Sequence, residues 1–157
     1  MNVISRYLSR DDVVIGLNVP DKVRALEEAA LLVESHHHVN HGPVFRALWR
    51  REQSASTALG HGIAIPHARI AGIPEPIVLI VRTREPIKFG APDRRAVSVL
   101  FVILVPEHAT DEHLQILATV SNMFADSDFR SRVEKAAEPG AIQRLIDEWT
   151  AGVPSAA

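Results

Sequence analysis

The chain has 157 residues, no cysteine and a formal net charge of −2 at pH 7, which excludes a disulfide-framed domain and a strongly basic nucleic-acid-binding domain. Hydrophobic residues make up 46% and charged residues 23%, a composition typical of a folded globular domain. The longest apolar run covers residues 99–105, too few to span a bilayer, and no basic start leads into an apolar segment. We therefore expect a soluble cytoplasmic protein that neither inserts into membranes nor binds nucleic acid.

The sequence contains no internal repeat, linker or low-complexity stretch that would divide it. Its length is close to that of an ordinary single domain. We expect one domain over residues 1–150 and a flexible tail of mostly small residues at 151–157.

The first third of the chain predicts a short helix at 3–8 and a strand at 13–17. Asp21 is placed to cap a helix whose apolar residues recur every three or four positions. The helical pattern ends at the run His36-His37-His38. Pro43 suits the first turn of a second helix. Residues 54–62, with three hydroxyl side chains and two glycines, predict a loop.

Three apolar runs then predict strands at 63–65, 77–81 and 97–105, and the last two are continuous and β-branched, as in strands buried on both faces. Thr110 or Asp111 is expected to cap a following helix. Its expected inner face consists of Leu114, Leu117, Val120, Ser121 and Phe124. Two more helices are predicted at 128–137 and 140–149. Strands enclosed by helices at both ends of the sequence predict an α/β sandwich, a sheet covered on both faces.

Histidine is the unusual component, with eight residues in the chain. His67 follows the short strand at 63–65 and comes directly after Pro66, which should end that strand abruptly. A side chain at a strand exit lies at the rim of a sheet, where α/β proteins place their ligands. We therefore expect His67 to face a binding site.

Several residues before His67 carry groups that suit an anion. Gly60 and Gly62 allow the backbone to direct N–H groups at a ligand, and Ser56, Thr57 and Arg51 add hydroxyl and guanidinium donors. Together these groups suit a dianion such as a phosphoryl group. The same residues are also compatible with a simple loop and an ordinary turn histidine.

Two segments resemble a known family. The first runs without a gap from Arg51-Glu52 through Ser56-Thr57 and Gly60-x-Gly62 to Ile63-Ala64-Ile65-Pro66-His67. The second joins Leu104-Val105-Pro106 to Asp111-Glu112-His113-Leu114-x-x-Leu117. They resemble the fructose/mannitol-type (type-2) enzyme IIA domains of the bacterial phosphotransferase system, and above all its stand-alone nitrogen-regulatory type. The resemblance covers residues 3–149.

The resemblance implies a mixed β-sheet flanked by helices and assigns roles to three residues. In this family the histidine of the Ile-Pro-His segment, here His67, carries the phosphoryl group as a tele-phosphohistidine, with phosphorus on Nε2. The second histidine, here His113, lies beside it and donates to the phosphoryl oxygens. The arginine, here Arg51, helps to hold the same group. The resemblance implies no cofactor and no metal.

The implied function is that of a phosphohistidine carrier that accepts its phosphoryl group from an HPr-like carrier and regulates partners through its phosphorylation state. The implied partners are regulatory targets such as sensor kinases or potassium transport proteins, or a IIB domain. Three alternatives stay open: a stand-alone sugar-specific IIA that passes phosphate to IIB, a histidine-based metal-dependent hydrolase, and a non-catalytic binding module with the same fold.

Some residues depart from the family pattern or invite another interpretation. Ala68 stands where relatives usually have glycine, and His61 stands where they often have asparagine, which adds a third imidazole near the expected site. The run His36-His37-His38 with His41 has the spacing of metal ligands, but an exposed helix end explains it as well. Arg69 follows His67 closely enough to assist the docking of an acidic partner.

Overall fold

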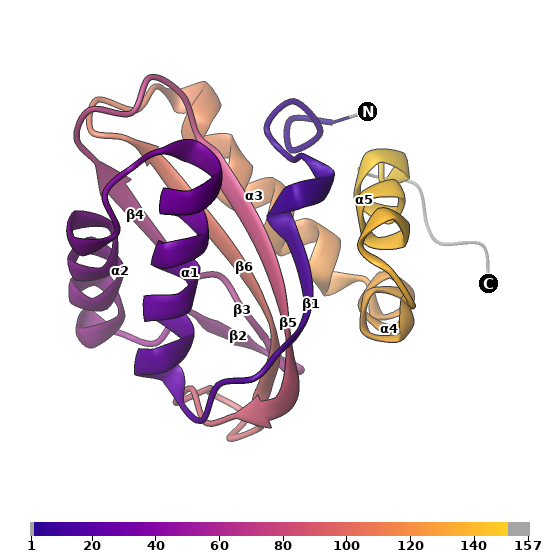
Figure 1. Cartoon of the computed structure of the whole chain (residues 1–157). Helices are drawn as coiled ribbons and strands as arrows, with labels where there is room; N and C mark the ends of the chain where they lie inside the picture. The colour runs from indigo at the N-terminus through magenta and orange to yellow at the C-terminus, as the bar shows by residue number, and fades with distance from the viewer. Residues whose placement is uncertain (1, 151–157) are drawn as a thin grey trace.

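The computed structural model, which describes residues 2–150, has a mixed sheet of six strands at its centre (Figure 1). These are β1 (Val13–Leu17), β2 (Ala58–Gly60), β3 (Ile63–Ala64), β4 (His67–Ile70), β5 (Ile77–Ile87) and β6 (Val97–Pro106). The order across the sheet is β1-β5-β6-β3-β2, and β4 pairs with β6 beyond the end of β3. β5 and β6 are antiparallel, whereas β1, β3 and β4 each pair in parallel with their neighbour in the centre.

Helices cover both faces of this sheet (Figure 1). They are α1 (Lys22–His37), α2 (His41–Ser54), α3 (Asp111–Ala125), α4 (Ser127–Lys135) and α5 (Pro139–Glu148), with a 3₁₀ turn, η1, at Arg10–Asp12. α1 and α2 bury their apolar side chains against one face. α3, α4 and α5 enclose a second apolar core against the other. The predicted α/β sandwich is confirmed.

The central strands are apolar because both of their faces are buried. In β6, Phe101 is fully buried and packs edge-on against Phe124 of α3, with 5.9 Å between ring centroids. Its neighbour Leu100 points to the opposite face and joins the core under α1 and α2. Burying each such side chain contributes about 1.5–3 kcal/mol. The continuous apolar runs predicted this placement.

The helix starts follow the signals in the sequence. The Asp21 side chain accepts the backbone N–H of Arg24 at 2.9 Å and so caps α1. Pro43 lies in the first turn of α2, where its missing N–H costs nothing. Thr110, not Asp111, caps α3. The helices predicted at 128–137 and 140–149 are confirmed to within two residues as α4 and α5.

Three predicted elements differ from the structure. Residues 3–7 form hydrogen-bonded turns and no helix: the Asn2 side chain accepts the Ile4 N–H as a helix cap does, but only one turn follows, closed by the Leu8 N–H on the Ile4 carbonyl. The predicted loop at 54–62 contains strand β2, which forms by pairing with β3. β5 continues past Val81 to Ile87, and the register shift after Arg82 accommodates Pro86.

The expected inner face of α3 is also partly wrong. Ile116, Val120, Met123 and Phe124 are buried, while Ser121 is exposed and Leu114 keeps 36% of its surface accessible. The helix carries two overlapping apolar stripes, and the pattern alone does not say which one meets the sheet. Leu114 and Leu117 are instead left at the edge of a surface cavity described below.

No helix within residues 2–150 is long and apolar enough to cross a membrane. The predicted tail at 151–157 lies outside the described residues.

Candidate functional site

His67 is the first residue of β4. Both β3 and β4 run parallel to β6, with Ile63 opposite Val99 and His67 opposite Ile103. Pro66 interrupts the strand between them, and its carbonyl accepts the Ile103 N–H at 2.9 Å. The predicted break before His67 is thus present, but the residue does not leave the sheet: it opens the next strand along the same neighbour.

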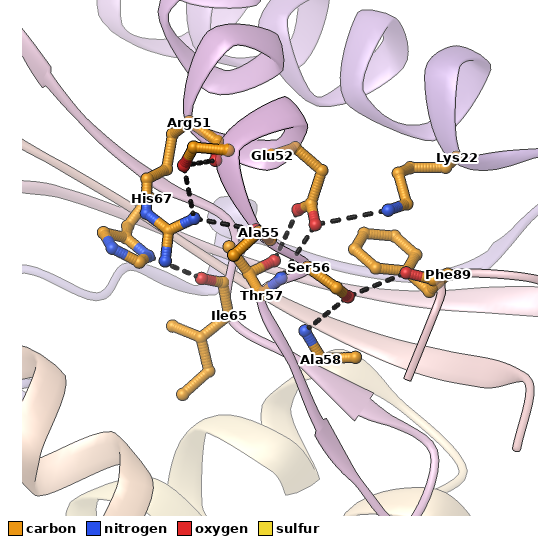
Figure 2. Close-up of polar contacts among 11 residues, drawn as sticks. Lys22, Arg51, Glu52, Ala55, Ser56, Thr57, Ala58, Ile65, His67 and Phe89 are labelled. Carbon is orange, nitrogen blue, oxygen red and sulfur yellow. Dashed lines mark hydrogen bonds and ion pairs between the residues drawn. The ribbon is translucent and has the colours of Figure 1, made fainter. Parts of the chain in front are cut away.

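The imidazole of His67 is half-buried and oriented by one hydrogen bond (Figure 2). Its Nδ1 lies 2.8 Å from the carbonyl oxygen of Ile65. A carbonyl only accepts hydrogen bonds, so Nδ1 carries the proton and donates it. In the neutral ring the lone pair therefore resides on Nε2.

The surroundings of His67 favour this neutral ring. Burial lowers the pKa of His67 below its ordinary value, because the imidazolium loses more solvation than the neutral ring. The bond to the Ile65 carbonyl opposes this effect and raises the pKa, while the charge of Arg51 lowers it and that of Glu52 raises it. Burial dominates, so His67 is mainly neutral at neutral pH.

Arg51 lies in the last turn of α2 and points toward the same place (Figure 2). Its Nη1 donates to the carbonyl of Ala55 at 2.8 Å and lies 3.4 Å from the hydroxyl of Ser54. These contacts hold the guanidinium beside His67. Among the side chains that the structure describes within residues 2–150, no carboxylate forms an ion pair with Arg51. The positive charge of Arg51 thus remains available to an anion.

Arg51 and His67 line one cavity of about 570 Å³ between α2, β4, β6 and α3. The other lining residues are Ala47, Arg50, Ser54, Ala68, Arg69, Ile103, Val105, Leu114 and Leu117. The cavity therefore combines three arginines and a histidine with an apolar floor, and none of these lining residues is acidic. Such a site attracts anionic groups.

The hydroxyls expected to contact a phosphoryl group are used elsewhere. Ser56 donates to the carbonyl of Phe89 at 2.8 Å, and Thr57 donates to the carboxylate of Glu52 at 2.6 Å (Figure 2). Neither residue lines the cavity around His67. The structure thus uses both hydroxyls within the loop after α2, and a role of Ser56 and Thr57 in binding a phosphoryl group stays a prediction.

Gly60 and Gly62 also lie away from His67. They flank the tight β2–β3 turn with positive φ values of 95° and 81°. Because β3 pairs with β6 at Val99, four positions from Ile103, this turn is about 13 Å along the sheet from His67. The glycines make the turn possible but do not face the cavity. His61, between them, is exposed and donates its N–H to Asp93, so it adds no third imidazole to the site.

His113 lies in the first turn of α3, one residue before the cavity-lining Leu114. Its ring packs edge-on against Tyr7, with 6.4 Å between centroids, and is not among the groups that line the cavity. Its buried Nδ1 has no hydrogen-bond partner within residues 2–150. The structure thus brings α3 to the site but does not show contact between the two histidines.

Three of the remaining five histidines form pairs with acidic residues. His36 Nδ1 and His37 Nε2 lie 3.1 and 3.0 Å from the buried carboxylate of Asp12, and His41 Nδ1 lies 2.8 Å from Glu34. In the described part of the chain, no group of three or more histidine, aspartate or glutamate side chains is arranged to hold a metal ion.

Glu52, Arg50 and Leu117 belong to the site region but were not identified from the sequence as part of it. A glutamate or arginine inside an amphipathic helix is normally on the solvated face, so nothing in the pattern of α2 distinguishes these two. The available signal is that Glu52 and Leu117 fall within the two segments that carry the family resemblance.

Fold and site together define a class of α/β domain with one arginine-flanked histidine in a surface cavity beside a mixed sheet. The family model described as phosphoenolpyruvate-dependent sugar phosphotransferase system, EIIA 2, matches residues 6–149. The chain belongs to this family of phosphotransferase-system IIA proteins.

Individual relatives agree with this assignment. The chain is 38% identical over 133 residues to a nitrogen regulatory protein of Pseudomonas aeruginosa, covering 83% of this chain and 86% of the relative. It is 37% identical to the nitrogen regulatory protein IIA-Ntr of Neisseria meningitidis, whose crystal structure superposes with a TM-score of 0.87 over 92% of this chain and 99% of that one. A fructose-specific EIIA component of Haloferax volcanii is 37% identical over 102 residues, 65% of this chain and 66% of that protein.

We predict that His67 titrates below 6.5 and that Arg51→Gln raises its midpoint. Removing the positive guanidinium favours the imidazolium, so the pKa must move upward. An NMR titration of the histidine ring resonances measures both values. Arg84→Gln, an exposed arginine outside the cavity, is the control and should leave the midpoint unchanged. A midpoint that is unaltered in Arg51→Gln would show that the guanidinium does not act on this ring.

Proposed function

We propose that the protein carries a phosphoryl group on Nε2 of His67, which it accepts from an HPr-like phosphohistidine carrier. The observation that supports this most directly is the bond from His67 Nδ1 to the Ile65 carbonyl, since it leaves Nε2 with a free lone pair. The cavity around the ring is positively charged and has room for a phosphoryl group. Membership in a phosphotransferase-system family supplies the reaction class.

In the proposed transfer, the Nε2 lone pair attacks the phosphorus of the donor's phosphohistidine, in line with the bond that breaks. A new N–P bond forms on His67, and the electron pair of the broken bond goes to the donor's ring. In this step the other nitrogen of the donor's ring carries a proton, so that ring departs as neutral imidazole and its positive charge passes to the ring of His67. The Nδ1 proton stays on His67, where the Ile65 carbonyl stabilises it. No general base is needed, because the lone pair is already free on the neutral ring.

Arg51 is proposed to stabilise the phosphoryl oxygens, since its guanidinium lines the same cavity as His67. An arginine can meet two oxygens at once through its planar fork. We propose that His113 assists by turning from Tyr7 toward the phosphoryl group. Its unpartnered Nδ1 supports this role, because a buried polar atom without a hydrogen bond gains stability from a new acceptor.

We further propose that the protein acts as a regulator of the nitrogen type. Relatives named nitrogen regulatory proteins align over most of the chain, in Pseudomonas aeruginosa at 38% and in Escherichia coli at 32% identity. A sugar-transport role is the second candidate, which the fructose-specific relative of Haloferax volcanii favours. In that case the acceptor would be a IIB domain, as in the complex of mannitol IIA with phosphorylated IIB from Escherichia coli.

The cavity also suggests the chemistry of the regulatory partner. Arg50 and Arg69 are exposed at its edge, and the half-exposed Leu114 adds an apolar contact. We propose that the partner presents acidic side chains around an apolar residue that enters the cavity. A phosphoryl dianion on His67 would neutralise much of the arginine charge and repel this partner.

The first test is phosphorylation in vitro. Incubation with phosphoenolpyruvate, enzyme I and the HPr-like carrier should add one phosphoryl group by intact mass, labile in acid and stable in base as a P–N bond requires. His67→Ala should abolish labelling while the circular dichroism spectrum stays that of the wild type. Full labelling of His67→Ala would contradict the assignment.

The second test concerns His113. One hydrogen bond to a charged oxygen contributes about 1.5–3 kcal/mol, so His113→Ala should slow phosphoryl uptake roughly ten- to a hundred-fold. The variant should still reach full labelling, because His67 is intact. Rapid-quench measurement of the labelling rate decides this. Uptake at the wild-type rate would mean that His113 does not reach the phosphoryl group.

The third test separates regulation from onward transfer. A partner captured with the unphosphorylated protein should lose affinity more than a hundred-fold on phosphorylation, corresponding to a change of about 3 kcal/mol. His67→Glu should weaken binding in part, and His67→Ala should bind regardless of the donor system. Titration calorimetry with the four forms, the wild type before and after phosphorylation and the two variants, provides the affinities. Equal affinities would favour a sugar-type IIA that passes its phosphate to an acceptor.

A further inference from the structure

Glu52 is a buried carboxylate close to the site. It lies in the last turn of α2, only 4% exposed, and accepts three hydrogen bonds (Figure 2). Two come from Thr57, whose N–H is 2.7 Å and whose hydroxyl is 2.6 Å from the carboxylate. The third comes from the ammonium of Lys22 at 3.3 Å. Lys22 also lies over the ring of Phe89, 4.6 Å from its centroid.

An ionised carboxylate in the interior is costly unless it is fully hydrogen-bonded. The contacts of Glu52 meet this requirement by holding the chain just after α2 in one conformation. Two donors of a single residue, Thr57, are directed at the two carboxylate oxygens, so the position and orientation of that residue are both restricted. The Thr57 carbonyl is consequently held as well.

The Thr57 carbonyl is connected to His67 through the backbone of Ile65. The backbone N–H of Ile65 donates to the Thr57 carbonyl at 3.0 Å. The carbonyl of the same Ile65 accepts the His67 Nδ1–H at 2.8 Å. A continuous series of hydrogen bonds therefore joins Glu52 to the imidazole through Thr57 and Ile65, and Figure 2 shows its first and last members. The Ile65 carbonyl is not fixed by the ladder with β6, which bonds the carbonyls of Gly62 and Pro66 instead.

We propose that Glu52 is a positioning residue for phosphoryl transfer: by holding Thr57, it fixes the Ile65 carbonyl that keeps the His67 proton on Nδ1 and the lone pair on Nε2. The inference rests on the proposed function, since it assumes that Nε2 accepts the phosphoryl group. Without this support the Ile65 carbonyl is free to turn away, and His67 populates the tautomer whose Nε2 carries the proton and cannot attack.

The tautomer of His67 can be read directly from the ring ¹⁵N chemical shifts of protein labelled at its histidines. The wild type should show Nδ1 protonated. Glu52→Leu and the milder Thr57→Val should shift the population toward the Nε2–H form and slow phosphoryl uptake about tenfold, the effect of losing one hydrogen bond of ordinary strength. Thr57→Ser keeps the hydroxyl, so it should show the wild-type tautomer of His67 and the wild-type rate of phosphoryl uptake.

Glu52→Gln separates hydrogen bonding from charge. Its amide oxygen can accept the Thr57 N–H, and its amide N–H can donate to the Thr57 hydroxyl, so the geometry is kept while the charge is lost. We expect a wild-type tautomer and an uptake rate within about threefold, less than one ordinary hydrogen bond contributes. A tautomer shift as large as in Glu52→Leu would show that the carboxylate acts through its charge, and would overturn the positioning role.

Asp12→Asn provides a matched control for stability. Asp12 is 1% exposed and also holds its surroundings by hydrogen bonds, with Ser9, His36 and His37, but it does not line the cavity. Its substitution should lower the midpoint of chemical unfolding and leave the His67 tautomer and the uptake rate unchanged. If Asp12→Asn altered the His67 tautomer as strongly as Thr57→Val, the effect would be one of general stability and the inference would be wrong.

Two outcomes distinguish this inference from the proposed function. Failure of the wild type to accept a phosphoryl group would refute the proposed function, whereas the tautomer measurement requires no donor and still reports on the link to Glu52. If the wild type is labelled and Thr57→Val and Glu52→Leu both keep the wild-type tautomer and rate, the proposed function stands and the role of Glu52 is refuted.

Discussion

The hydrogen bond between His67 Nδ1 and the Ile65 carbonyl is the contact on which the chemistry of the site depends. The Ile65 carbonyl is available for this bond because it faces away from β6, which instead bonds the carbonyls of Gly62 and Pro66. The backbone N–H of Thr57, on the other side of Ile65, donates to Glu52 and so leaves the carbonyl to the imidazole.

Burial and charge act together on the same ring. Burial lowers the pKa of His67 and so favours the neutral imidazole, and the positive charge of Arg51 lowers the pKa as well. Arg51, which disfavours the imidazolium, also lines the cavity in which we propose that the phosphoryl group binds. Under that proposal, one arrangement keeps the histidine nucleophilic before transfer and stabilises its negatively charged product afterwards. The hydrogen bond to the Ile65 carbonyl and the charge of Glu52 oppose these two effects, because each raises the pKa of His67.

α3 shows how the fold divides one helix between stability and function. Its side chains Ile116, Val120 and Met123 are buried against the sheet, whereas Leu114 and Leu117 border the cavity of His67. The same helix therefore anchors the second core and supplies an apolar wall to the site. His113, in its first turn, lies close to this wall without lining it.

The sequence by itself determined the layered α/β architecture, the cap of α1 at Asp21, the place of Pro43 in the first turn of α2, and the candidate histidine, since apolar periodicity, capping and proline act over a few residues. Only the tertiary structure decided which groups surround His67. Ser56 and Thr57 turn to Phe89 and Glu52, and the glycine turn lies elsewhere along the sheet. The physical reason is that strand register and helix rotation depend on contacts between segments far apart in the chain, which no local pattern encodes.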